Sequence, residues 1–104
     1  LNSNAQNQSL TYSKVILLTA LELDTVPQGK VWKVVSYQSA VAANGSITMK
    51  VNGNVMIIYS KYHLQDAMIN QETPFPMWFP AGTTIEPFSY CDFLNIIEFT
   101  ENNE

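Results

Sequence analysis

The sequence predicts an all-β protein, an antiparallel β-sandwich of about seven or eight strands. Segments of alternating apolar and polar residues recur along the chain, separated at short intervals by Pro/Gly or Asn/Gly turn signals. No stretch has the apolar repeat of a helix of ordinary length. The 104 residues fit one domain, expected at 10–100, with a polar N-terminal arm at 1–9 and a C-terminal tail at 101–104.

The first part of the domain consists of extended segments joined by a turn. The alternation and the apolar run within residues 9–23 predict one bent strand or two strands. Pro27 and Gly29 then predict a turn that closes a hairpin, with Pro27 in the second turn position, since proline fixes φ and glycine tolerates a positive φ. Residues 31–41 alternate with both faces partly apolar, which predicts a strand whose first half is covered on both sides.

Two Asn-Gly pairs predict the next turns. Asn44 and Gly45 are the strongest short hairpin signal in the chain, because a type I′ turn needs a positive φ at both central positions. Asn52 and Gly53 turn the chain again. We therefore expect a three-stranded meander made of residues 31–41, 46–51 and 55–60.

Residues 61–72 are the one stretch without strand alternation, and we expect a long loop there. The segment 73–87 follows, with four of the five prolines and three large aromatic residues. Within it, Pro80 and Gly82 repeat the earlier Pro-x-Gly turn, which predicts a strand, a tight turn and a return strand. We expect Trp78 to point into the core and its neighbours Met77 and Phe79 to face the opposite way.

The final strand is expected at residues 93–100. Phe93, Ile97 and Phe99 alternate there with Leu94 and Ile96. Glu98 follows on the face of Leu94 and Ile96, where an unpaired charge is costly. We expect this end of the strand to reach solvent, or Glu98 to pair with a lysine such as Lys33.

The composition excludes several classes of function. The net charge is −4, with five lysines and no arginine, whereas phosphate-backbone binding needs clustered positive charge. We therefore expect no nucleic-acid ligand. Only 13% of the residues are charged, and the remaining polar positions hold mainly Asn, Gln, Ser and Thr. Such a surface suits packing into an assembly or contact with sugars. No apolar run has the roughly 18 residues of a membrane span.

The two ends and the single cysteine add three expectations. Leu1 is neither an initiator methionine nor part of a signal-peptide pattern, so we expect a processed product or a fragment. We expect a neighbouring subunit to hold the arm at 1–9. Cys91 is alone, which excludes an intrachain disulfide and indicates a small buried hydrophobic residue in a strand.

No constellation of residues indicates a reaction, and we expect no catalytic, cofactor or metal site. His63 is the only histidine, and although Asp66 follows it, no nucleophile motif accompanies them. A hydrolase using carboxylates of the last two strands remains a remote alternative. Those carboxylates are Glu86, Asp92 and Glu98.

Aromatic residues are the better functional candidates, because their faces stack on sugars or anchor subunit contacts. Tyr59 and Tyr62 flank the start of the expected loop, beside His63 and Gln65. We predict that these four residues form an exposed ligand or receptor patch. Most other aromatic residues, Trp32 and Trp78 included, are expected in the core.

Three segments resemble a known group of proteins: VPQGKVWKV at 26–34, PMWFPAGTTI at 76–85 and NIIEF at 95–99. The order and the residues of these segments resemble those of small β domains in structural proteins of bacteriophages and their Bacteroidetes hosts. Those domains combine a VPAGKVWK segment, a P-x-W-x-PAGT segment and a closing IIEF strand. This chain departs from them at Gln28, where alanine is usual.

The resemblance implies a jelly-roll or TNF-like module of a virion spike, fibre or tail tip. It implies a location in a virion or outside the cell, and no catalytic residue. We therefore expect a structural module that forms a homo-oligomer, with a trimer favoured, contacts other virion proteins and contributes to host attachment. The alternative is a carbohydrate-binding or adhesion domain that recognises a cell-surface glycan.

Overall fold

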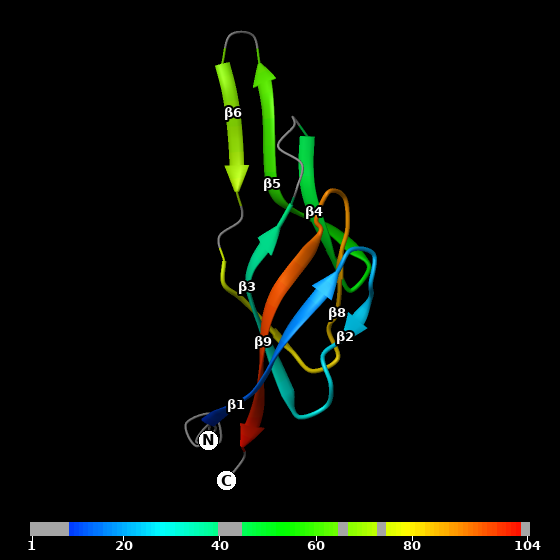
Figure 1. The fold of residues 1–104 in the computed structure, drawn as a ribbon, viewed down its shortest axis with the longest axis vertical. Helices are drawn as coiled ribbons and strands as arrows, with labels where there is room; N and C mark the ends of the chain where they lie inside the picture. Colours follow the sequence, from blue (N-terminus) through cyan, green and yellow to red (C-terminus); the bar gives the residue numbers. More distant parts are fainter. Residues whose placement is uncertain (1–8, 40–44, 65–66, 73–74, 103–104) are drawn as a thin grey trace, which may run out of the picture.

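The computed structural model describes residues 9–39, 45–64, 67–72 and 75–102, excluding the side chains of 61–72. These residues contain nine β-strands and no helix, and they form two antiparallel sheets (Figure 1). The predicted all-β sandwich is confirmed, and the additional strand, β2, has two residues. The strands are β1 (Ser9–Thr19), β2 (Asp24–Thr25), β3 (Lys30–Gln38), β4 (Gly45–Val51), β5 (Asn54–Leu64), β6 (Ala67–Glu72), β7 (Met77–Pro80), β8 (Thr84–Pro87) and β9 (Phe93–Asn102).

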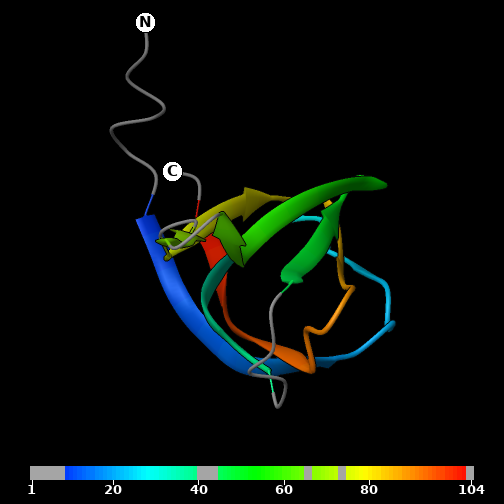
Figure 2. The same ribbon diagram turned by 90° about the horizontal axis from the view of Figure 1, so that it is seen from above.

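The two sheets divide the strands so that the chain repeatedly crosses between them. One sheet has the order β1-β9-β3-β7 and the other β2-β8-β4-β5-β6. Viewed from above, the two sheets enclose the space that the core fills (Figure 2). The molecule is elongated, with extents of 56 × 28 × 22 Å, and the β5–β6 hairpin projects beyond the rest of the sandwich (Figure 1).

The core lies between the sheets and follows the alternation of the sequence. On β9, Leu94 and Ile96 are fully buried, whereas Phe93, Ile97 and Phe99 are half-buried on the other face, as predicted. Side chains of both sheets meet in one cluster, as the inward faces of a sandwich do. Its buried members are Leu18, Val26, Trp32, Val34, Ile47, Met49, Ile58, Ile85, Cys91, Leu94 and Ile96.

The two Pro-x-Gly turns have the same structure, which confirms that one turn is used twice. The N–H of Lys30 donates to the carbonyl of Pro27, and that of Thr83 to the carbonyl of Pro80, at 3.1 and 3.2 Å. The glycines of both turns have a positive φ, 79° at Gly29 and 91° at Gly82. Each proline thus occupies the first turn position. The prediction that Pro27 lies in the second position was wrong by one residue.

Neither Pro-x-Gly turn closes a hairpin, which corrects the sequence prediction. The first joins β2 to β3 and the second joins β7 to β8, and in each case the two strands belong to different sheets. Two hydrogen bonds also join the turns to each other. Val26 N–H donates to the Thr83 carbonyl and Gly82 N–H donates to the Val26 carbonyl, both at 2.9 Å. Paired turns therefore connect the two sheets at one end of the sandwich.

Gly82→Ala is expected to lower the free energy of unfolding by about 1–2 kcal/mol, because alanine carries a steric penalty in the left-handed region. A Cβ at Gly82 would meet nothing within 4 Å, so the cost comes from the backbone alone. Urea unfolding followed by circular dichroism measures the change. Gly82→Asn is the matched control, with a smaller loss since asparagine tolerates a positive φ. An equal loss for both variants would contradict this account.

One of the two Asn-Gly predictions is confirmed. Asn52 and Gly53 have φ values of 53° and 81° and join β4 to β5, which pair as an antiparallel hairpin. Asn44 lies outside the described residues, and Gly45 begins β4. The hairpin expected there is wrong, because β3 and β4 belong to different sheets. The meander consists instead of β4, β5 and β6.

The long loop predicted at 61–72 is also wrong. Residues up to Leu64 continue β5, and Ala67–Glu72 pairs back as β6. Backbone hydrogen bonds form in such a hairpin whatever its side chains are. Apolar and polar residues alternate where one face of a strand lies on a core, and a hairpin that projects from the sandwich is not subject to that constraint. The alternation rule therefore missed it.

Side chains of the proline-rich segment alternate between the two faces of β7 as predicted, but the inward and outward faces are exchanged. Met77 and Phe79 pack against the core, whereas Trp78 is 48% exposed. Trp32 already fills the interior and lies opposite Phe79 in the β3–β7 register, while Lys33 on the outer face lies opposite Trp78. The prediction that Trp78 points into the core was therefore wrong, and that of Trp32 was right.

Candidate functional site

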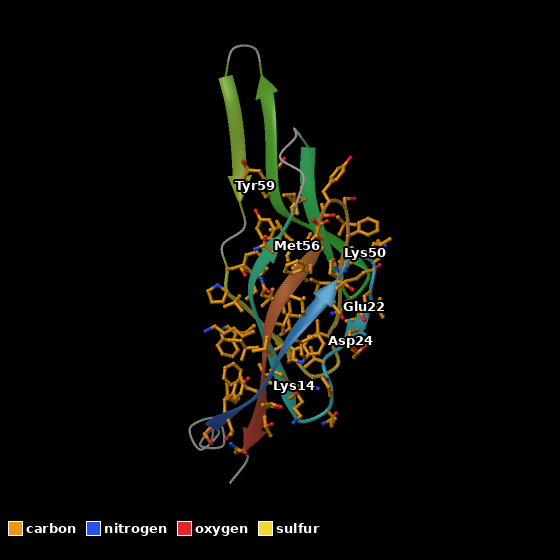
Figure 3. All side chains as sticks on the ribbon, viewed as in Figure 1. Lys14, Glu22, Asp24, Lys50, Met56 and Tyr59 are labelled. Atoms are coloured by element: carbon orange, nitrogen blue, oxygen red, sulfur yellow. The ribbon has the colours of Figure 1, made fainter. Side chains whose placement is uncertain are left out.

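The predicted patch of Tyr59, Tyr62, His63 and Gln65 falls largely outside the described side chains. Tyr59, on β5, is half-buried and packs against the core (Figure 3). The backbones of Tyr62 and His63 continue β5 and pair with Ile69 and Met68 of β6. Their side chains, and all of Gln65, lie outside the described residues. The patch remains a prediction, carried by a hairpin instead of a loop.

Glu98 is the one acidic side chain found buried among the described residues, and it is 3% exposed. Its two oxygens accept hydrogen bonds from elements on either side of β9. Trp32 Nε1–H of β3 donates to Oε1 at 3.0 Å, and Ser13 Oγ–H of β1 donates to Oε2 at 2.9 Å. These bonds replace the expected ion pair with Lys33. The second expectation, exposure to solvent, is wrong.

A β-bulge in β1 builds this arrangement. The β1–β9 register shifts between Tyr12 and Lys14, so Ser13 and Lys14 together oppose the single residue Glu98. The bulge lets Ser13 reach the carboxylate and keeps Tyr12 opposite Phe99. Trp32 is the direct cross-strand neighbour of Glu98 on the other side. Neighbouring residues on the two adjacent strands, Ser13 and Trp32, therefore supply the hydrogen bonds that the buried carboxylate of Glu98 needs.

The charge state of Glu98 follows from these contacts. Burial raises the pKa of its carboxyl, but the hydrogen bonds from Trp32 and Ser13 and the positive charges of Lys14 and Lys30 outweigh that effect. The pKa of the Glu98 carboxyl therefore lies below the usual glutamate value, and the group is ionised at neutral pH. Among the described residues, no buried side-chain nitrogen or oxygen lacks a hydrogen-bond partner. The cluster is thus a satisfied internal network.

The three carboxylates considered for hydrolysis lie in different settings. Glu98 is inside the sandwich, Glu86 is half-buried on β8 of the other sheet, and Asp92 is exposed in the loop before β9. Glu98 uses both oxygens for internal hydrogen bonds. It is therefore placed to stabilise the fold, and no second carboxylate faces it in the interior row.

Cys91 is buried, as predicted, although it precedes β9 and does not lie within a strand. Burial, with a smaller contribution from Asp92, raises the pKa of the thiol to about 11. Its Sγ lies 3.7 Å from the carbonyl oxygen of Phe93. The thiolate, the nucleophilic form, is scarce at neutral pH, so Cys91 serves as a packing residue.

The outer face of the β1-β9-β3-β7 sheet carries an exposed apolar surface. Five of the ten exposed large hydrophobic side chains among the described residues lie on this face. Half-buried apolar residues of β3 and β9 connect them across the sheet. This outer-sheet surface comprises the exposed Leu10, Tyr12, Val15, Leu17 and Trp78, with the half-buried Val31, Ile97 and Phe99.

Trp78 is already in contact with its neighbours on this surface. Its ring lies 5.5 Å from that of Phe99, at an interplanar angle of 33°, and Lys33 Nζ lies 5.2 Å from its centroid. The register places Val15, Ile97, Lys33 and Trp78 in one row across the four strands. Trp78 was expected in the core, so the sequence did not indicate this surface.

The described residues contain no group of three or more His, Cys, Asp or Glu side chains placed to hold a metal ion. Among them there is also no helix long and apolar enough to span a membrane. The geometry thus defines a β-sandwich with a satisfied interior and one apolar outer face. No protein-family model matches the chain, and searches of the curated proteins and of the solved structures find no match either.

Proposed function

We propose that this chain is a structural module of a virion, a component of a spike, fibre or tail tip that assembles as a homo-oligomer. The outer-sheet surface is the observation that carries the proposal. Exposed large apolar patches on soluble domains mark interaction sites, and aromatic residues are enriched where proteins meet. The low proportion of charged residues, 13%, also suits an assembling surface.

The jelly-roll topology belongs to this proposal. A jelly roll has eight strands in two sheets, with the chain crossing between them. Without β6, the described residues form eight strands in the orders β1-β9-β3-β7 and β2-β8-β4-β5. This order supports a jelly roll with an added hairpin strand. The resemblance of segments 26–34, 76–85 and 95–99 to phage structural domains supports the same assignment.

Size-exclusion chromatography with multi-angle light scattering tests self-assembly. We expect a mass that is a multiple of the 11.7 kDa chain, because an exposed apolar face is covered by association. The measurement is repeated over a hundredfold range of concentration, and mass spectrometry of purified particles tests the virion location. A stable monomer throughout that range, together with absence from such particles, contradicts the proposal.

A carbohydrate-binding or adhesion function is the second candidate, favoured by the projection of the β5–β6 hairpin (Figure 1). That hairpin includes Tyr62 and His63, and a projecting element is well placed to touch a host glycan. A glycan array tests the function, with Tyr62→Ala as the variant. No signal for the native chain, or equal binding by the variant, contradicts glycan binding at this hairpin.

A further inference from the structure

We infer that the outer-sheet surface is the contact through which a second copy of this chain binds. The inference rests on the proposed self-assembly and assigns it to one face of the molecule. Val15 and Leu17 of β1 are 63% and 53% exposed, and Trp78 of β7, at the opposite edge of the sheet, is 48% exposed. The exposed apolar side chains therefore extend across the whole face and are not confined to one strand.

The size of this face suits a stable protein contact. Its four strands contain 11, 10, 9 and 4 residues. At about 3.3 Å per residue and about 4.8 Å between strands, they cover roughly 500 Å² in projection. The relief of the side chains makes the accessible area larger, so it approaches the roughly 800 Å² that each partner contributes to a standard interface.

The charge of the face suits a copy of the same chain. Its strands direct two charged residues outward, Lys33 in the row of Trp78 and Glu101 opposite Leu10. These charges sum to zero, whereas the chain as a whole carries −4. Two copies therefore avoid net repulsion when they meet at this face, and no strongly charged partner is required.

The contacts of Trp78 favour a protein partner over a sugar. A sugar-binding platform presents an open aromatic face on which the sugar ring stacks. Here the ammonium of Lys33 lies over the Trp78 ring and the Phe99 ring packs beside it. A tryptophan held in this way is pre-organised, and tryptophan is among the residues that contribute most to protein interfaces.

The outer face of the other sheet provides a matched control. Val55 of β5 is 57% exposed, close to the 63% of Val15, and each is a valine on the surface of a strand. Substitution of either by lysine places a charge where the isolated chain has solvent. Only Val15→Lys places that charge within the proposed contact, where an unpaired buried charge is costly.

The experiment measures the mass of the native chain, Val15→Lys, Leu17→Lys and Val55→Lys by light scattering across a dilution series. We expect the native chain and Val55→Lys to associate alike, and the other two variants to raise the dissociation constant at least about tenfold. Far-UV circular dichroism confirms that each variant is folded. Trp78→Ala is expected to weaken association by at least about 30-fold, because tryptophan is among the residues whose truncation costs most at protein interfaces.

The possible outcomes separate the inference from the proposed function. If the native chain associates but Val15→Lys and Leu17→Lys associate equally well, the assignment of this face is overturned and self-assembly stands. If Val55→Lys alone dissociates, the contact lies on the other sheet and the inference is again overturned. If the native chain is monomeric at every concentration, self-assembly itself fails.

Discussion

Replacing Trp32 by alanine is expected to lower the free energy of unfolding by about 3–5 kcal/mol. Trp32 is 1% exposed and is the largest of the fully buried side chains. It lies between Phe79 of β7 and Glu98 of β9 on the core face of the sheet. Truncation therefore leaves a cavity and removes the hydrogen bond from Nε1–H to Glu98. Urea unfolding at pH 7, followed by far-UV circular dichroism, measures the loss.

Two further variants separate the loss of the hydrogen bond from the loss of the buried ring. Trp32→Phe keeps most of the buried ring but removes the N–H donor, so it should cost about 1.5–3 kcal/mol, the range for a hydrogen bond to a charged group. Val55→Ala, at a site 57% exposed, should cost less than about 1 kcal/mol. If Trp32→Ala costs no more than Val55→Ala, Trp32 does not hold the core together.

The stability of the native protein is expected to fall more steeply in acid than that of Glu98→Gln. Folding lowers the pKa of Glu98, since hydrogen bonds and nearby lysines outweigh the effect of burial. The resulting stabilisation is fully present above the unfolded-state pKa of about 4.3. It is lost as the pH falls through the lower pKa of the folded state, because the proton then binds and the stabilised charge disappears.

The measurement is the free energy of unfolding from pH 7 to about pH 3 for both proteins. At pH 7 we expect Glu98→Gln to be less stable by about 1.5–3 kcal/mol, since it loses charge-assisted hydrogen bonds. The difference should shrink as the pH falls. Glu22→Gln is the control, because the Glu22 carboxylate also accepts two hydrogen bonds from Thr19 but is exposed. Its effect should be much smaller. A difference for Glu98→Gln that does not change with pH rules out this role for its charge.

Much of the secondary structure could be predicted from the sequence, because it depends on neighbouring residues. Alternation on the last strand correctly placed Leu94 and Ile96 on one face and Ile97 and Phe99 on the other. Turn chemistry correctly identified Asn52 and Gly53 and the shared turn at Gly29 and Gly82. The candidate patch at Tyr59 and Tyr62 rested on residue type and on an expected loop, and the structure has the β5–β6 hairpin in place of that loop.

The all-β class, the positions of most strands and the burial of Trp32 and Cys91 could thus be predicted from the sequence alone, since period and turn propensity are local properties. Tertiary contacts set which sheet each strand enters, which way Trp78 faces and which residues bind the Glu98 carboxylate. A Pro-x-Gly turn fits a hairpin and a crossover equally well, and alternation does not say which face is inward. Ser13 and Glu98 are 85 positions apart in the chain, and they meet because β1 pairs with β9 around a one-residue bulge. Such contacts depend on register between distant strands, which no local pattern encodes.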